Sequence, residues 1–292
     1  MGSVERRRTW VLCLAVLSCT PDASRQDGQL IDFEPPNVQA EPGTLFRGSF
    51  SPDGTEFYYF VKVAEAAEDY RVYRTSRLGS GWSAPEFLPL GDPNASTMYP
   101  VVSPDGRLLV FTTYRPVDSD AQNANLWAAP RSGPGWGEPI PLTEASTSEN
   151  YDASPWFGPE GDLHFSSTSA DWSETWARKA PRLGEAYGSW SADTLWDELD
   201  LPRETHHFWS GVVNQEGTIA VVELSERQAD GSLGDSDLWM TRLASGTWSA
   251  PAPLEQGVNT ERTENFATFA PDGSTLVFVR DFTEFHSIVL NR

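Results

Sequence analysis

Cysteine is scarce in this chain, and it is confined to one end. The 292 residues include two cysteines, Cys13 and Cys19, and there is none from Thr20 onward. The bulk of the chain therefore holds no disulfide, no cysteine nucleophile and no thiolate metal site. Packing and hydrogen bonding have to stabilise whatever fold follows.

Basic residues are also few. Lysine and arginine together number 21 against 42 aspartates and glutamates, which gives a formal net charge of -21. Such an acidic chain is repelled by phosphate backbones, so nucleic acid is excluded as a partner. Anionic lipid headgroups repel it for the same reason, and attachment to a membrane would therefore require a lipid anchor.

No apolar run approaches the roughly 20 residues needed to span a bilayer, but a short one lies near the start. Arg6, Arg7 and Arg8 precede the apolar run 10–17, which is followed by Ser18 and Cys19. A basic segment, a short apolar segment and a small residue, in that order, predict an export signal over residues 1–18.

The end of that segment, Val16-Leu17-Ser18-Cys19, resembles the lipobox of bacterial lipoproteins. The resemblance implies that Cys19 becomes the lipidated first residue of an exported protein. It also implies the periplasmic side of the outer membrane, because Thr20 stands where an aspartate is associated with inner-membrane retention. Residues 19–43 show little apolar periodicity, so we expect a lipidated N-terminus and a tether that includes a closing strand.

Five copies of a four-residue turn segment divide the rest of the chain, with an acidic third residue and a glycine at the fourth position. The acidic residues are separated by 52, 55, 56 and 56 positions, a period that is typical of one propeller blade. Proline presets the first corner of such a turn, the carboxylate accepts backbone amides, and glycine takes the positive-φ position. The copies are 51–54 (Ser-Pro-Asp-Gly), 103–106 (Ser-Pro-Asp-Gly), 158–161 (Gly-Pro-Glu-Gly), 214–217 (Asn-Gln-Glu-Gly) and 270–273 (Ala-Pro-Asp-Gly).

The residues around each turn predict two antiparallel strands. A large apolar residue lies three positions before the acid, and a small or compact one lies two positions earlier, as crowded strands near a propeller axis require. After the turn, apolar residues alternate in the pattern of a strand. The alternating pairs are Phe57/Tyr59, Leu109/Phe111, Leu163/Phe165, Ile219/Val221 and Leu276/Phe278.

A third strand follows each pair, and a glycine-rich turn then leads to an outer strand that begins with tryptophan. This tryptophan occurs four times, at Trp82, Trp136, Trp190 and Trp248, so a fifth outer strand has to come from elsewhere. The segment 30–33 is the expected donor, because pairing beside the last blade removes an exposed edge. The sequence thus predicts an all-β, five-bladed β-propeller over residues 44–292, with its last blade closed by an N-terminal strand.

These repeats resemble those of TolB-like and WD-like propellers of the Pro-Asp type, which belong to the bacterial envelope. The resemblance rests on the Ser-Pro-Asp-Gly turns, the Asp-Leu-Trp strand at 237–239 and the Trp-x-x-Pro edges, and it covers about Phe46 to Arg292. Two copies depart from the pattern, because Glu160 replaces the aspartate and the turn at 214–217 lacks proline. The retained glycines and apolar pairs still predict a blade at both places.

Familiar enzyme motifs are absent: there is no Gly-x-Ser-x-Gly elbow, no phosphate-binding glycine loop and no His-Glu-x-x-His. In propellers, the loops that enter the inner strands gather around one mouth of the channel, where ligands commonly bind. The corresponding stretches carry aromatic, basic and carboxylate side chains, a combination suited to a sugar or a peptide end. The predicted ligand-binding residues are Arg47, Tyr99, Tyr151, His206, His207, Trp209 and Asn265.

Two functions are compatible with this pattern. The first is a non-catalytic, envelope-anchored binding or scaffold propeller, expected to be monomeric and free of cofactors, which recognises a protein or another envelope component such as a glycan. The second is a carbohydrate-active enzyme at the channel mouth. A glycoside hydrolase would use two carboxylates, with Asp152 and Glu264 as candidates, and a polyuronide lyase would use His206 or His207 as its base. No spacing fixes a metal geometry, and a structural Ca²⁺ at the mouth is the one cofactor kept as an alternative.

Overall fold

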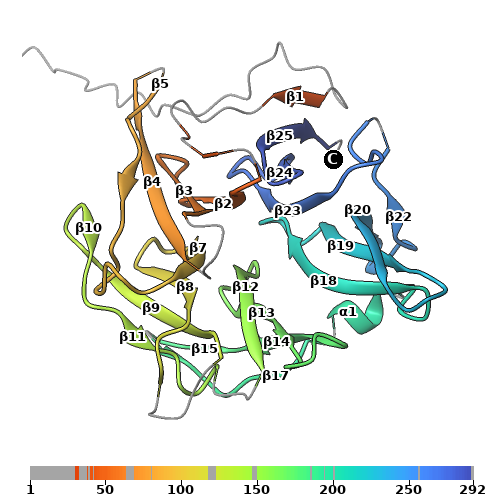
Figure 1. Ribbon diagram of the computed structural model, residues 1–292, viewed down its shortest axis with the longest axis horizontal. Helices are drawn as coiled ribbons and strands as arrows, with labels where there is room; N and C mark the ends of the chain where they lie inside the picture. The colour runs from red at the N-terminus through yellow and green to blue at the C-terminus, as the bar shows by residue number, and fades with distance from the viewer. Residues whose placement is uncertain are drawn as a thin grey trace, which may run out of the picture.

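The computed structural model shows an all-β chain arranged as five sheets around a central axis (Figure 1). Among the described residues, no helix has the length and hydropathy needed to cross a bilayer. Cys19 and the predicted export signal lie outside the described part of the chain. The structure describes residues 30–32, 38, 40–41, 43–63, 69–79, 81–117, 123–146, 150–184, 186–193, 195–199, 201–255 and 257–290.

Each sheet is one blade, and its first strand lies nearest the axis (Figure 1). Blade 1 contains β2 (Leu45–Phe50), β3 (Glu56–Lys62), β4 (Tyr70–Leu78), β5 (Gly81–Trp82) and β6 (Glu86–Phe87). Blade 2 contains β7 (Thr97–Val102), β8 (Leu108–Thr113), β9 (Asn125–Ser132), β10 (Gly135–Trp136) and β11 (Ile140–Pro141). Blade 3 contains β12 (Tyr151–Phe157), β13 (Leu163–Thr168), β14 (Thr175–Ala180) and β17 (Ser191–Ala192), with the hairpin β15 (Arg182–Leu183) and β16 (Ala186–Tyr187) beside it.

The short helix α1 (Leu195–Glu198) separates blade 3 from blade 4 along the chain. Blade 4 contains β18 (His206–Val213), β19 (Ile219–Arg227), β20 (Leu233–Ala244), β21 (Thr247–Trp248) and β22 (Ala252–Pro253). Blade 5 contains β23 (Glu264–Phe269), β24 (Thr275–Arg280), β25 (Glu284–Val289) and β1 (Leu30–Asp32). The predicted five-bladed propeller is therefore confirmed.

The repeated turns connect the first and second strands of every blade, as the sequence predicts. In blade 1, Asp53 Oδ1 accepts the Ser51 hydroxyl at 2.7 Å and the Thr55 amide at 3.0 Å. In blade 4, where proline is missing, Asn214 Oδ1 instead accepts the amides of Thr218 at 2.8 Å and Ile219 at 3.0 Å. The fourth-position glycines all have positive φ, at Gly54 (68°), Gly106 (72°), Gly161 (85°), Gly217 (70°) and Gly273 (69°).

The ring is closed by β1, the strand from the N-terminal segment. It pairs antiparallel with β25, with Leu30 opposite Ile288 and Asp32 opposite His286. The order within blade 5 is β1-β25-β24-β23, so the earliest strand that the structure describes takes the outer position for which the sequence has no fifth tryptophan strand. Blade 1 in turn packs on blade 5, where the Leu45 amide donates to the Phe282 carbonyl at 2.7 Å.

Deleting Leu30, Ile31 and Asp32 is expected to lower the melting temperature by several degrees and to promote aggregation. The deletion removes main-chain hydrogen bonds worth about 1 kcal/mol each and leaves β25 as an unpaired edge. Differential scanning calorimetry and light scattering measure the two effects. The control deletion removes Ser24, Arg25 and Gln26, which has the same length and keeps β1; equal stability of both deletions would contradict closure by β1.

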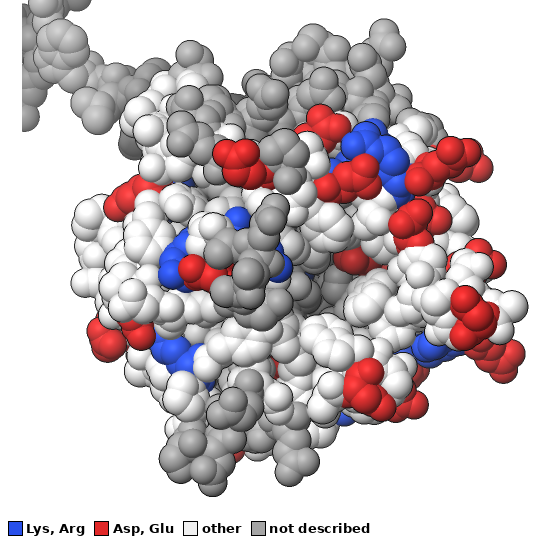
Figure 2. Space-filling view, in the orientation of Figure 1, with Lys and Arg blue, Asp and Glu red and all other residues white. Residues whose placement is uncertain are grey.

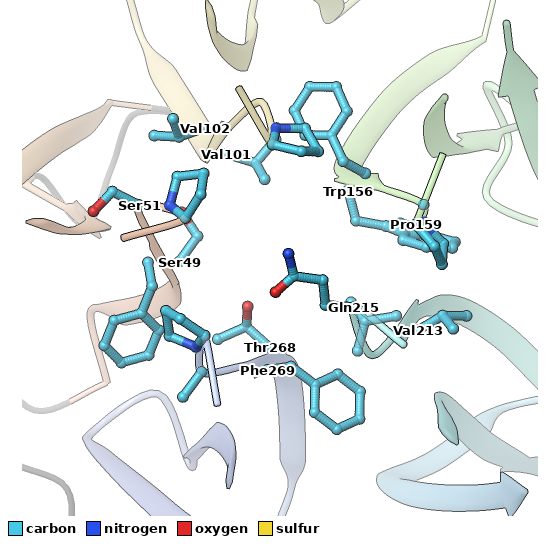
Figure 3. Close-up of a pocket in the computed structure, with 18 of the residues that line it drawn as sticks. Ser49, Ser51, Val101, Val102, Trp156, Pro159, Val213, Gln215, Thr268 and Phe269 are labelled. Atoms are coloured by element: carbon cyan, nitrogen blue, oxygen red, sulfur yellow. The ribbon is translucent and has the colours of Figure 1, made fainter. Parts of the chain in front are cut away.

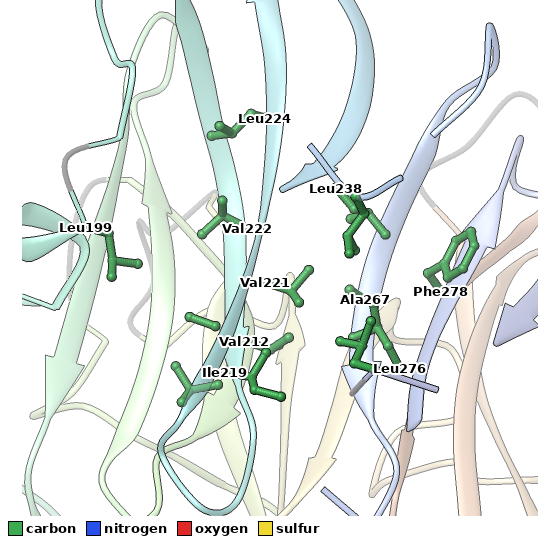
Figure 4. Packing of buried hydrophobic residues seen from close by; sticks show 14 of the residues in the cluster. Leu199, Val212, Ile219, Val221, Val222, Leu224, Leu238, Ala267, Leu276 and Phe278 are labelled. Carbon is green, nitrogen blue, oxygen red and sulfur yellow. The ribbon is translucent and has the colours of Figure 1, made fainter. Parts of the chain in front are cut away.

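The core lies between adjacent blades. Apolar side chains of blades 4 and 5, among them Val221, Leu238 and Leu276, fill the space between the two sheets (Figure 4). One large member of this cluster was not predicted from the repeats: Trp196 of α1 is 1% exposed and packs between Trp156 and Phe208, with ring centroids 6.0 and 5.5 Å away. The helix thus fills the space between blades 3 and 4.

Candidate functional site

All five inner strands contain a β-bulge, and in each the bulge lies near the middle of the strand or in the half farther from the repeated turn. The register shifts occur between Leu45 and Gly48, Met98 and Val101, Ala153 and Trp156, Phe208 and Ser210, and Asn265 and Thr268. Within three of these bulges, Tyr99, Ser154 and Phe266 have φ values of 51°, 52° and 56°. Left-handed backbone is costly for residues other than glycine, and such strain concentrates at functional sites.

The bulges turn side chains toward a cavity of about 650 Å³ at this end of the channel, called here the channel-mouth cavity. Its lining is mostly aromatic and hydroxyl-bearing, and it includes two carboxylates. None of the described lining residues is lysine, arginine or histidine. The lining consists of Tyr70, Tyr99, Tyr114, Tyr151, Ala153, Ser154, Ser166, Thr168, Trp172, Trp209, Ser210, Glu223, Ser225, Gly234, Asp235, Ser236, Thr263, Asn265, Phe266 and Phe282.

The aromatic wall consists of rings that contact one another. The Tyr151 ring lies 5.1 Å from the Trp172 ring and 6.0 Å from the Tyr114 ring, and Tyr99 lies 6.1 Å from Phe266. Burial raises the pKa of Tyr99 and of Tyr151, so both phenols stay protonated at neutral pH. Trp172 is 52% exposed, and its ring is the part of the wall that is open to solvent.

Glu223 is the buried carboxylate of the channel-mouth cavity. It lies on β19, in an otherwise apolar stretch of this strand, and its Oε2 accepts the Phe266 amide at 3.1 Å and the Ser210 hydroxyl at 3.4 Å. Burial raises the pKa of Glu223 to about 7, although hydrogen bonds from Phe266, Ser210 and Ser236 and the Arg47 charge act in the opposite direction. Glu223 therefore exchanges its proton near neutral pH.

Arg47 lines a smaller cavity of about 150 Å³ toward the other end of the channel, and its charge also acts on Glu223 and Tyr99 of the channel-mouth cavity. It is 3% exposed, and burial lowers its pKa to about 10, while the charge of Glu223 acts to raise it. Around this second cavity, the Gln215 side chain reaches toward the middle of a ring that includes Thr268 and Trp156 (Figure 3). Figure 2 shows most acidic side chains toward the outer part of the face it presents.

Four of the predicted ligand-binding residues, Tyr99, Tyr151, Trp209 and Asn265, line the channel-mouth cavity together. The two histidines lie apart, in a hollow of about 210 Å³ between blades 3 and 4 that also contains Arg203 and Arg227. As expected for neighbours on a strand, they face different ways. The His206 ring contacts Trp239 at 5.1 Å, whereas the His207 ring contacts Trp209 at 4.3 Å.

His207 is held as a neutral imidazole. Its Nδ1 accepts the Arg227 guanidinium at 3.3 Å, and its Nε2 lies 3.3 Å from the Thr175 hydroxyl. Burial, together with the Arg227 charge, lowers the pKa of His207 to about 4. Within the described part of the chain, no group of three or more histidine, cysteine, aspartate or glutamate residues could hold a metal ion.

The two carboxylates proposed for hydrolysis lie outside the channel-mouth cavity lining. Asp152 is 1% exposed and accepts the Ser146 hydroxyl at 2.8 Å. Glu264 is fully buried; its Oε1 accepts Arg280 Nε at 2.8 Å, and its Oε2 accepts the Thr260 amide at 3.0 Å. Each carboxylate thus links the inner strand on which it lies to the loop that leads into that strand.

Several lining residues were missed by the sequence reasoning. Glu223 could have been predicted from the sequence. It interrupts the apolar run Ile-Ala-Val-Val-Glu-Leu at 219–224, and a carboxylate in such a strand is buried unless the strand is exposed. Trp172 and Phe282 carried none, because each lies between strands, outside the repeated pattern. Only the closure of the ring brings them to the same mouth.

No protein-family model matches the sequence, and no curated protein matches it either. Solved structures with a similar shape include one assigned as TolB from Agrobacterium tumefaciens, at 18% identity, 81% coverage of this chain, 69% of that chain and a TM-score of 0.48. They also include an oligogalacturonate lyase from Vibrio parahaemolyticus, at 11% identity, 87% and 68% coverage and a TM-score of 0.44. A puromycin hydrolase matches at 16% identity and a TM-score of 0.44, over 81% of this chain but 34% of its own length. At these values the likeness assigns neither ligand nor activity.

Proposed function

We propose that this chain is a non-catalytic binding propeller of the bacterial envelope, anchored through a lipid on Cys19, which recognises an envelope component at the channel-mouth cavity. One observation carries the proposal: all five inner strands bulge, and the bulges of four blades aim side chains into one aromatic cavity. Bulges that re-aim side chains and strained residues that point into a cavity are typical of binding sites.

The state of the predicted catalytic groups also supports binding over catalysis. Glu264 is occupied by Arg280 and Thr260, and Asp152 by Ser146, so neither carboxylate faces the cavity with a free oxygen directed at a substrate. His207 lies in a separate hollow, with both ring nitrogens near polar partners. These groups hold loops and strands in place.

Trp172→Ala is expected to reduce the recovery of crosslinked partners from cell envelopes about tenfold, because tryptophan is enriched among the residues that dominate binding and a ligand in the cavity would bury its exposed ring. The matched control is Trp190→Ala, which removes a 39% exposed tryptophan of the same blade that does not line the cavity. Quantitative mass spectrometry of captured material compares the variants. The absence of any wild-type partner, or an equal loss in both variants, would count against the proposal.

The alternative function is a glycoside hydrolase. The carboxylates that favour it are not the predicted pair, Asp152 and Glu264, but two others. Glu223 and Asp235 both line the channel-mouth cavity, and a carboxyl group with a pKa of about 7 is suited to act as a general acid. A panel of oligosaccharides assayed for new reducing ends tests it. Turnover that disappears in Glu223→Gln would replace the binding proposal with the enzyme.

A further inference from the structure

We propose that the channel-mouth cavity binds its ligand through an alkylammonium group, which the aromatic wall surrounds and for which Glu223 is the counter-ion. The inference rests on the proposed binding function and adds the chemical class of the ligand. Three features of the cavity support it: the sign of its charges, the state of Glu223 and the arrangement of its rings.

The charges in the lining have one sign. Glu223 and Asp235 contribute carboxylates, and no lysine, arginine or histidine is among the described lining residues. The faces of the tyrosine, tryptophan and phenylalanine rings add the negative side of their quadrupoles. Arg47, the cation that acts on Glu223 and Tyr99, lies in the lining of the neighbouring cavity. Against the lining itself, an anionic ligand is repelled, a neutral ligand gains contact area alone, and a cation gains both contact area and electrostatic attraction.

Glu223 differs in its partners from Glu264, which is fully buried, and from Glu56, which is partly buried. Glu264 is paired with Arg280 at 2.8 Å, and Glu56 is paired with Arg74 at 2.9 Å. Glu223 accepts hydrogen bonds from the neutral donors Ser210, Phe266 and Ser236, and within the described residues no ion pair reaches it. Because Arg47 acts on it only through space, the buried carboxylate has room for a cationic partner inside the cavity.

The rings provide faces on several sides of the cavity. Tyr114, Tyr151 and Trp172 form one connected group from blades 2 and 3. A second group joins Phe266 of blade 5 to Tyr99 of blade 2 and to Phe282, at 6.1 and 5.9 Å. Ammonium groups bind when two or more aromatic faces lie within about 6 Å of the positive charge. The volume of about 650 Å³ admits a methylated ammonium together with a further portion of the ligand.

The test uses choline and its uncharged isostere 3,3-dimethylbutan-1-ol, in which a carbon replaces the charged nitrogen. Isothermal titration calorimetry at pH 8 with the full-length protein is expected to show choline binding at least about tenfold more tightly than the alcohol. In Glu223→Gln the preference is expected to shrink to about threefold or less, while the alcohol binds as before. Glu226→Gln, an exposed carboxylate on the same strand, is the control and is expected to keep the full preference.

Proton release gives a second readout that packing alone does not move. At pH 7, choline binding is expected to expel a fraction of a proton from Glu223, seen as a dependence of the binding heat on buffer ionisation enthalpy. Asp235 and Tyr99 also line this cavity, and the Arg47 charge acts on Glu223 from the neighbouring cavity, so the release must vanish in Glu223→Gln and persist in Asp235→Asn. Equal affinity for choline and the alcohol, or no binding of either, overturns the cation inference. Partner capture that still depends on Trp172 would show that the binding function itself survives.

Discussion

At pH 8, the Glu223→Gln variant is expected to be about 3 kcal/mol more stable than the wild-type protein. The pKa of Glu223 is about 7 in the folded protein, against 4.5 for an unperturbed glutamate. Between pH 4.5 and pH 7, the carboxyl group is therefore mostly protonated in the folded state and mostly ionised in the unfolded state. The free energy of unfolding of the wild-type protein therefore falls as the pH rises from 4.5 to 7, and the full cost is present above pH 7. Glutamine avoids the buried charge and still offers an oxygen to the Phe266 amide.

Urea denaturation at two pH values measures this effect. At pH 4.5 the advantage of Glu223→Gln is expected to shrink below about 1 kcal/mol, because the folded wild-type protein then has a neutral carboxyl group. Glu226→Gln is exposed and is expected to change stability little at either pH. An advantage of Glu223→Gln that is the same at pH 4.5 and pH 8 would show that the gain comes from packing and not from charge. A carboxylate that costs stability at neutral pH is consistent with a residue kept for binding.

Glu264→Gln is expected to destabilise the propeller by about 3 to 5 kcal/mol, the cost of leaving one member of a buried ion pair alone. The change leaves the Arg280 guanidinium, which is 8% exposed, without its carboxylate partner. Thermal unfolding followed by circular dichroism measures the loss. The control Glu284→Gln removes a half-exposed carboxylate of the same blade, 3.9 Å from Arg262, and is expected to cost under about 1 kcal/mol.

The double variant Glu264→Gln/Arg280→Met separates a structural role from a catalytic one. Removing both charges is expected to recover most of the lost stability, because no uncompensated ion remains in the core. Ligand binding at the channel-mouth cavity is expected to be unchanged in this double variant, since neither residue lines the cavity. A folded double variant that had lost all turnover on an oligosaccharide would instead restore Glu264 as a catalytic candidate.

The fold was predictable because its determinants are local and repeated. The turns from Ser51 to Gly273 carry their own hydrogen-bond acceptors and glycines, so each hairpin is specified within about six residues. Closure by the segment near Leu30 was predictable because the sequence contains five repeated turns but only four outer tryptophan segments, so one blade lacks its own outer strand. Trp196 was not predictable, since α1 interrupts the repeat and its burial depends on how blades 3 and 4 meet.

The candidate site was predictable only where it follows the repeat. Tyr99, Tyr151, Trp209 and Asn265 lie 6, 9, 7 and 7 positions before the acidic turn residue of their copies, and they do meet at one mouth. Strand periodicity alone does not show which face a residue takes inside a bulge, because the extra residue shifts the alternation of the strand. Arg47 illustrates this point: it lies within the bulge of β2 and lines the cavity toward the opposite end of the channel.

The pairing of β1 with β25 has a consequence for how the molecule acquires its structure. Leu30 lies opposite Ile288, so the earliest described strand of the chain has to wait for the last one before the ring can seal. Bringing the ends of so long a segment together costs about 5 kcal/mol of chain entropy unless the intervening blades are already assembled. Folding should therefore end with the pairing of β1 and β25, at a rate set by this most distant contact. A chain that crosses a membrane unfolded would reach its closed form only after the whole propeller has emerged.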